Sequence, residues 1–146
     1  YTEEIYPGHP VNESGCWAAC ASMIISYYGD EDEPVPEPPE VFQWAVDEGL
    51  YTGAGITMGK LIRILEHYGI RAERKSLTGK QIKDRLNNVG PFVMYTERGY
   101  FSVGGHYIVL VSIDQDMMVT VVDPNSRRKS EAKHCNNCLF HSYFSP

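Results

Sequence analysis

The sequence predicts an α+β fold, with helices in the N-terminal half of the chain and an antiparallel sheet in the C-terminal half. Apolar residues recur at helical spacing in the first part of the chain, and from Pro91 onward they gather in short runs rich in β-branched residues. The 146 residues are the length of one domain, and a hydrophobic content of 42% is enough for a core. We therefore expect a single domain over residues 1–146.

The composition excludes several classes of function. A net charge of -6 without a basic stripe argues against a nucleic-acid partner. No stretch reaches the roughly 18 apolar residues of a membrane span. The chain starts at Tyr1 without an initiator Met or an apolar leader, which suggests a processed domain or one excised from a larger protein. The cysteine count leaves the compartment open, and we favour a secreted protein of bacterial origin.

The N-terminal part predicts an arm, a turn and a helix. Residues 1–13 contain two prolines and no helical period, so we expect an extended arm. Residues 12–15 (NESG) are typical of a turn. Apolar residues then follow i, i+3, i+4 spacing over residues 16–28, and Gly29 ends the run. The first helix is therefore expected over 16–28.

Cys16 stands at the start of this helix. Unpaired N–H groups and the positive end of the helix dipole lie at the first turn, and both favour a thiolate over a thiol. Because the thiolate is the reactive form, Cys16 is a candidate nucleophile for acyl transfer. The ordinary alternative is a buried cysteine that only fills the core, and Cys20, one turn later, is most simply such a residue.

The middle of the chain predicts an exposed loop and three helices. Residues 30–39 are acidic and rich in proline, which indicates a solvated loop, with a rim contact for a basic substrate segment as the alternative. Helices are expected at 40–48 and at 58–68, the second capped by Thr57.

A weakly alternating stretch follows at 70–75 and predicts an edge strand. After it, Thr78 is expected to cap a third short helix that ends near Gly90.

The last part predicts a β-meander. Residues 91–96 form one expected strand, and 106–113 (HYIVLVSI) form the strongest strand signal, with the composition of a central strand. Residues 114–116 (DQD) are typical of a hairpin turn, and 117–122 form the return strand. The tail at 127–146 carries cysteines and histidines.

His106 and Asp123 are brought together by this hairpin. His106 opens the central strand and Asp123 ends the next one, so both lie near the same end of two adjacent strands. Cross-strand neighbours are about 5 Å apart, close enough for a carboxylate to bond an imidazole and fix its tautomer. The second ring nitrogen can then serve Cys16 as a base. Taken singly, His106 is ordinarily a strand-end histidine and Asp123 the start of an Asp-Pro turn.

At this point the chain resembles a known family. The segment CWAACASMIISYYG from Cys16 is similar to the nucleophile helix of papain-like cysteine peptidases of the C39-like group, which includes bacteriocin-processing domains. C70-type effector peptidases carry a similar Cys-Trp-Ala-Ala segment. The segment GHYIVLV from Gly105, the Asp-Pro turn at Asp123 and GPFVMY from Gly90 are similar to the strands that carry the other catalytic residues. The resemblance covers roughly residues 10–126.

The resemblance implies a papain-like fold, with the nucleophile helix packed on the sheet and a Cys16–His106–Asp123 triad. It also implies a peptide or protein substrate, and this chemistry needs no cofactor. We expect a cysteine peptidase that works through an acyl-enzyme. The same triad could instead pass the acyl group to an amine, as a transferase or ligase, or the chain could be a pseudoenzyme that binds peptides.

One position departs from the family's pattern. The family usually carries a Gln six residues before the nucleophile, where it helps to bind the oxyanion, and here that position is Pro10. Asn12 is the nearest amide and our oxyanion candidate, with His9 also close. Losing one such donor costs about 100- to 1000-fold in rate.

The expected substrate-binding residues are Trp17, Gly104 and Gly105. The two glycines precede His106 and leave room for a substrate backbone. The tail contains His134, Cys135, Cys138 and His141, a set of zinc-ligand types that lacks the second separated pair of a zinc finger. A local disulfide or reduced thiols are the favoured interpretation of this cluster, and no metal is assigned.

Overall fold

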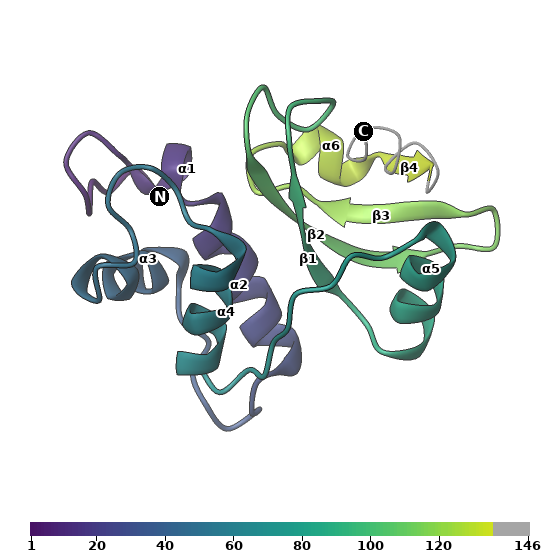
Figure 1. Cartoon of the computed structure of the whole chain (residues 1–146), viewed down its shortest axis with the longest axis horizontal. Coiled ribbons are helices and arrows are strands. Elements are labelled where there is room, and N and C mark those ends of the chain that lie inside the picture. The colour runs from purple at the N-terminus through teal and green to yellow at the C-terminus, as the bar shows by residue number, and fades with distance from the viewer. Residues whose placement is uncertain (136–146) are drawn as a thin grey trace. The chain divides into compact units, whose positions relative to one another are not determined.

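Four helices form the first of the two compact units into which the chain divides (Figure 1). The computed structural model describes residues 1–135. The first unit runs from Tyr1 to Arg74 and the second begins at Lys75. The helices of the first unit are α1 (Val11–Ser14), α2 (Cys16–Tyr28), α3 (Pro38–Asp47) and α4 (Met58–His67).

Helix α2 is the centre of the first unit and packs against both α3 and α4. The expected helical period is confirmed, because α2 starts at Cys16 and ends before Gly29. The Thr57 cap of α4 is confirmed too, since its hydroxyl accepts a hydrogen bond from the Lys60 N–H at 3.3 Å. The largest fully buried side chains of this unit are Trp17, Val41, Phe42, Leu61 and Ile64.

The expected extended arm at residues 1–13 is wrong in its last part. Residues from Val11 form α1, and Val11 is buried. The preceding chain folds back on itself, because the Val11 N–H donates to the carbonyl of Glu3 and the Asn12 N–H to that of Tyr1. Pro10 is the N-cap of α1, a position that needs no intrahelical N–H donor, so this proline does not oppose the helix.

Helix α3 begins earlier than expected, at Pro38 instead of Glu40. Prolines are tolerated in the first helical turn because the N–H groups there have no intrahelical partner. The Glu40 carboxylate reaches back to the Glu37 N–H at 2.7 Å and closes a capping box. The exposed loop therefore ends before Pro38 instead of at residue 39.

The second unit contains a four-stranded antiparallel sheet in the order β1-β2-β3-β4. Its strands are β1 (Phe92–Thr96), β2 (His106–Ile113), β3 (Met118–Val122) and β4 (Lys133–Cys135). The unit also contains α5 (Gly79–Asn88) and the short α6 (Arg127–Glu131). Helices followed by an antiparallel sheet confirm the predicted α+β class, and the order is consistent with a papain-like fold.

The β1–β2–β3 meander has the predicted strands with one irregularity. Thr96 pairs with His106 between β1 and β2. Between β2 and β3 the register shifts between Leu110 and Ser112, which is a β-bulge on β2. The core of this unit lies between the sheet and α5, which contacts β2. It consists of Ile82, Leu86, Phe101, Ile108, Leu110, Val119 and Val121.

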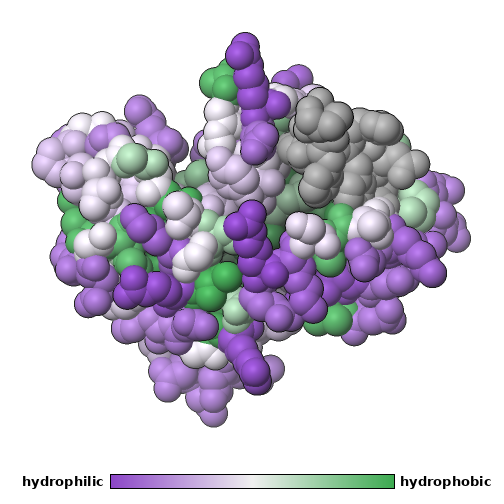
Figure 2. Space-filling view, in the orientation of Figure 1, coloured by the Kyte–Doolittle hydropathy of each residue, from purple (hydrophilic) through white to green (hydrophobic). Residues whose placement is uncertain are grey.

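Two segments differ from what the sequence predicts: residues 70–75, which cross from the first unit into the second, and residues 127–135. No strand forms at residues 70–75, where Arg71, Glu73 and Arg74 are exposed and leave no apolar face for a partner. In addition, α6 and β4 lie within the Cys/His-containing tail at 127–146, for which the sequence predicts no helix or strand. The face drawn in Figure 2 is mainly hydrophilic with small hydrophobic patches. None of the helices within residues 1–135 has the length and apolar character needed to cross a membrane.

Asp114 closes the β2–β3 turn and ties it to β4. Its Oδ2 lies 2.7 Å from Lys133 Nζ, and its Oδ1 accepts from the N–H groups of Met118 and Asp116. The hydrogen bond from Lys133, followed by those from the backbone, lowers the pKa of Asp114. A lowered folded-state pKa stabilises the protein above the ordinary Asp pKa of about 3.9 and stops doing so as the pH falls through the folded value.

We expect Asp114→Asn to lower the thermal unfolding midpoint at pH 7, because the amide keeps an acceptor for the turn but loses the attraction to Lys133. The difference from the native chain should shrink below about pH 3.9 as Asp114 becomes protonated. Circular dichroism melts at pH 7, 4 and 3 measure it, and an equal difference at all three values would contradict the assignment.

Candidate active site

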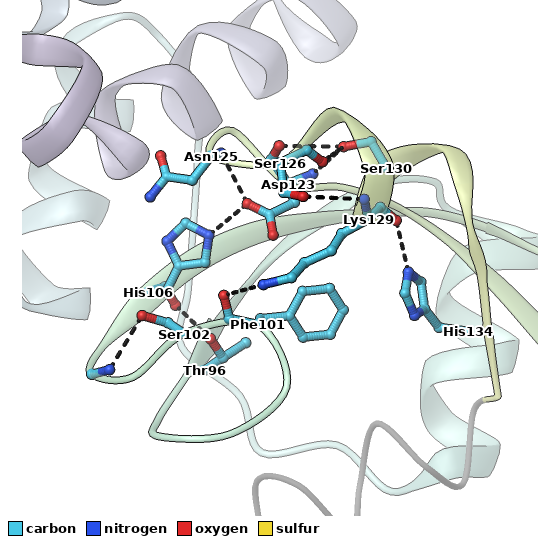
Figure 3. A network of polar contacts seen from close by, with 11 residues as sticks. Thr96, Phe101, Ser102, His106, Asp123, Asn125, Ser126, Lys129, Ser130 and His134 are labelled. Atoms are coloured by element: carbon cyan, nitrogen blue, oxygen red, sulfur yellow. Dashed lines mark hydrogen bonds and ion pairs between the residues drawn. The ribbon is translucent and has the colours of Figure 1, made fainter.

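His106 and Asp123 meet at one edge of the sheet in the second unit. His106 is the first residue of β2, and Asp123 directly follows β3. His106 Nε2 lies 2.7 Å from Asp123 Oδ1, and both side chains are buried. Figure 3 shows the second ring nitrogen of His106 on the side of the ring away from Asp123. One nitrogen is thus bonded to a carboxylate while Nδ1 is left to act on another group.

The Asp123 carboxylate is held through one of its two oxygens. Oδ1 accepts both from His106 and from the backbone N–H of Asn125, at 2.9 Å. Oδ2 is buried and has no hydrogen-bond partner within residues 1–135. The orientation of the carboxylate toward His106 therefore depends on Oδ1 and on the backbone that carries the side chain.

Neighbouring strands fix the backbone of His106. Thr96 pairs with it across β1 and β2, and the buried Thr96 hydroxyl donates to the His106 carbonyl at 3.2 Å. His106 is therefore held in two places, because Asp123 orients its ring and Thr96 binds its main chain.

Cys16 lies at the N-terminus of α2 in the first unit and is partly exposed. The N-cap is Gly15, and no side chain caps this end or brings a carboxylate into the first turn. Helices α4 and α5, in contrast, are capped by the hydroxyls of Thr57 and Thr78. The positive end of the α2 dipole is therefore not offset by a cap at the residue where a thiolate would form.

Gly15 also has a packing role between α1 and α2. A Cβ at this position would lie 2.5 Å from the Val11 carbonyl oxygen, closer than a carbon atom can approach. Only glycine lets α1 end and α2 start within one residue, and this places Cys16 at the first position of its helix.

The two candidate oxyanion groups lie in different surroundings. Asn12 is exposed on α1, and its backbone N–H donates to the carbonyl of Tyr1. His9 Nδ1 lies 3.1 Å from the Tyr51 hydroxyl and 3.4 Å from Ser14 Oγ, within a group of aromatic rings. Nδ1 of His9 is thus engaged within the first unit, whereas the Asn12 side chain is exposed to solvent.

Trp17 is a core residue of the first unit. It is 1% exposed, and its ring lies against those of Phe42 and Tyr51, at centroid distances of 4.9 and 5.7 Å. With the indole ring covered in this way, Trp17 anchors the first turn of α2, the turn that begins with Cys16.

The two glycines before His106 differ in the space around them. A Cβ on Gly104 would meet no atom within 4 Å. A Cβ on Gly105 would collide with the Tyr95 hydroxyl, so the glycine at this position accommodates the Tyr95 side chain. Gly104 therefore faces open space, and Gly105 does not.

The Cys/His cluster of the tail falls largely outside the described residues, since Cys138 and His141 lie beyond residue 135. Cys135 lies in β4, and His134 is buried beside it. His134 Nε2 is 2.8 Å from the Lys129 carbonyl, and its ring lies against those of Tyr100 and Phe101. His134 therefore has a structural role, since it joins β4 to α6 and to the loop that contains Tyr100 and Phe101.

Helix α6 contributes residues that the sequence analysis did not single out. Ser126 caps α6 through the Lys129 N–H at 3.2 Å, and Ser130 bonds the backbone of Asp123 at 2.8 Å. A serine directly after the Asp-Pro-Asn turn is the signal of a helix start that could have indicated this element.

Comparison with known proteins identifies one family. A family model described as papain-like cysteine protease AvrRpt2 matches residues 9–138, most of the chain. The match supports the papain-like part of the resemblance and does not bear on the C39-like group. It also extends past residue 126, where the sequence resemblance was expected to end, and so includes α6 and β4. No curated protein and no solved structure matches the chain significantly.

Proposed function

The chain belongs to the AvrRpt2 family of papain-like cysteine proteases, and we propose that it is a peptidase whose catalytic residues are Cys16, His106 and Asp123. The observation that carries this proposal is the buried 2.7 Å contact between His106 Nε2 and Asp123 Oδ1, which leaves Nδ1 available as a base. The uncapped start of α2 at Cys16 supports it independently.

In the proposed reaction, His106 Nδ1 takes the proton of Cys16 Sγ, and the thiolate attacks the carbonyl carbon of a peptide bond. The backbone N–H of Cys16 and the side chain of Asn12 donate to the oxyanion that forms. His106 then returns the proton to the amine that leaves, and the acyl group remains as a thioester on Cys16. A water molecule, deprotonated by His106, hydrolyses the thioester and restores the thiol.

The asymmetric hold on Asp123 suits its part in this scheme. A carboxylate that accepts the Nε2–H of His106 keeps the tautomer in which Nδ1 carries the lone pair, and it stabilises the imidazolium that forms when Nδ1 is protonated. Gly104 offers open space beside His106, and we propose it as a point of approach for the substrate backbone.

The pH dependence of Cys16 alkylation tests the proposal without knowledge of the substrate. We expect iodoacetamide to modify Cys16 well below the ordinary thiol pKa of about 8.5, because an imidazolium and the helix dipole both favour the thiolate. The His106→Ala variant should lose this advantage. Peptide mass spectrometry reads each site separately, so Cys135 and Cys138 serve as references in the same sample.

Two results would overturn the proposal. One is a Cys16 that reacts no faster than Cys135 and Cys138 at every pH. The other is a low-pH reactivity that His106→Ala leaves unchanged, since the helix alone would then account for it. Either result would favour a protein that binds peptides without cleaving them.

A further inference from the structure

Asp123 is held from behind by α6. The Asp123 N–H donates to Ser130 Oγ at 2.8 Å, and Ser130 Oγ lies 3.2 Å from the Asp123 carbonyl and 3.0 Å from that of Ser126. One hydroxyl therefore accepts from the main chain of Asp123 and donates back to the same turn. Figure 3 shows this network beside the His106 ring.

The rest of the turn is closed by the backbone. The Ser126 N–H donates to the Asp123 carbonyl at 3.1 Å, and the Asn125 N–H donates to Asp123 Oδ1. Since Oδ2 has no partner in the described part of the chain, no other side chain corrects the carboxylate if the backbone of Asp123 moves. The position of Oδ1 relative to His106 then depends on the turn, and the turn depends on Ser130.

Helix α6 is itself tied to the loop that leads into His106. Lys129 Nζ donates to the Phe101 carbonyl at 2.8 Å and lies over the rings of Tyr100 and Phe101. Phe101 is a buried member of the core of this unit, so it gives α6 a fixed base. Helix α6 thus contacts both the turn that begins at Asp123 and the loop that precedes His106.

We infer that Ser130 is a positioning residue of the candidate active site, which acts through the backbone of Asp123 to aim the carboxylate at His106. Its effect on catalysis rests on the proposed peptidase function, whereas its effect on the geometry of the His106–Asp123 pair does not. The two effects can be measured separately.

The test compares four versions of the 146-residue chain: the native sequence, Ser130→Ala, Ser130→Thr and Thr78→Ala. Thr78→Ala is the matched control, because it removes a hydroxyl that caps α5 in the same unit, where it accepts from the Gln81 N–H. Ser130→Thr keeps the hydroxyl. The first measurement is the ¹H NMR signal of the His106 Nε2–H bonded to Asp123, assigned by its loss in His106→Gln.

We expect Ser130→Ala to shift or broaden this signal, while Ser130→Thr and Thr78→Ala leave it as in the native chain. With a peptide that the native chain cleaves, Ser130→Ala should lower kcat about 10- to 100-fold with little change in KM, because a misaligned base slows the reaction and not the binding. Ser130→Thr should restore most of the loss.

The inference is wrong if Ser130→Ala and Thr78→Ala change the signal to the same small extent. If Ser130→Ala shifts the signal but the native chain cleaves no peptide, the positioning role of Ser130 stands and the proposed peptidase function is refuted. A shifted signal with an unchanged kcat would show that the orientation of Asp123 does not limit the reaction, and it would overturn the catalytic part of the inference.

Discussion

Replacing Cys16 by serine is expected to abolish peptide hydrolysis, with a loss in kcat/KM of about 10⁴- to 10⁶-fold. The substitution changes one atom at the first position of α2 and keeps a side chain of nearly the same size. Its hydroxyl is a far weaker acid than a thiol, so neither the helix dipole nor an imidazole at His106 produces an anion from it near neutral pH. The variant should therefore lose the proposed nucleophile and keep the local structure.

The measurement begins with a library of peptides, in which mass spectrometry identifies bonds that the native chain cleaves. Rates for Cys16→Ser are then compared with rates for Cys20→Ala, the matched control one helical turn later. Cys20 is fully buried, so its truncation should lower the unfolding midpoint and leave cleavage in place. The role of Cys16 would be contradicted if Cys16→Ser cleaved the peptide at the native rate, or if Cys20→Ala lost cleavage and Cys16→Ser did not.

The proximity of His106 and Asp123 was predictable from sequence because it depends only on the two strands and on the short turn between them. The run HYIVLVSI has a strong strand signal, the DQD turn is short, and the Asp-Pro step ends the return strand. A hairpin with these limits must bring its two outer ends together, whatever its detailed register. The sequence therefore predicts that His106 and Asp123 share one edge of the sheet.

The exact register could not be predicted in the same way. The first five residues of β2 are buried in succession, so hydrophobic alternation does not distinguish one pairing from its neighbour. The bulge between Leu110 and Ser112 settles the offset by one residue, and no glycine or proline marks it. The 2.7 Å contact thus depends on a feature that only the structure shows.

Helix α6 was missed for a different reason. It has five residues and none of them is buried, so it leaves no apolar period in the sequence. A helix this short is not stable alone, and here it is held by contacts to Asp123 and Phe101 that lie outside its own segment. The expected strand at 70–75 is wrong because the sequence there alternates only weakly, and no strand within residues 1–135 pairs with it.

Replacing Asp123 by alanine is expected to lower kcat/KM by about 10³- to 10⁴-fold, because the His106 ring loses the acceptor that fixes its tautomer and orientation. The Asn125 N–H loses its partner as well, so the turn that follows β3 should loosen. Thermal unfolding and kcat/KM on the same peptide measure both effects.

Asp123→Asn is the more informative variant of the pair. A single oxygen, Oδ1, accepts from both His106 and Asn125, and an amide oxygen can do the same. The amide NH₂ would then occupy the place of Oδ2, a buried oxygen with no partner among the residues described. We therefore expect Asp123→Asn to retain more activity than Asp123→Ala, yet to unfold at a lower temperature than the native chain, since a buried donor left unpaired costs about 1–3 kcal/mol.

The two variants distinguish orientation from charge as the contribution of Asp123. If orientation dominates, activity should fall in the order native chain, Asp123→Asn, Asp123→Ala. If Asp123→Asn is as slow as Asp123→Ala while both remain folded, the negative charge beside the imidazolium must contribute more than orientation does. An oxygen acceptor for His106 Nε2–H would then not be enough to keep the activity. Measuring kcat/KM on the same peptide for all three proteins, beside their thermal unfolding midpoints, separates these cases, because the midpoints show which variants remain folded.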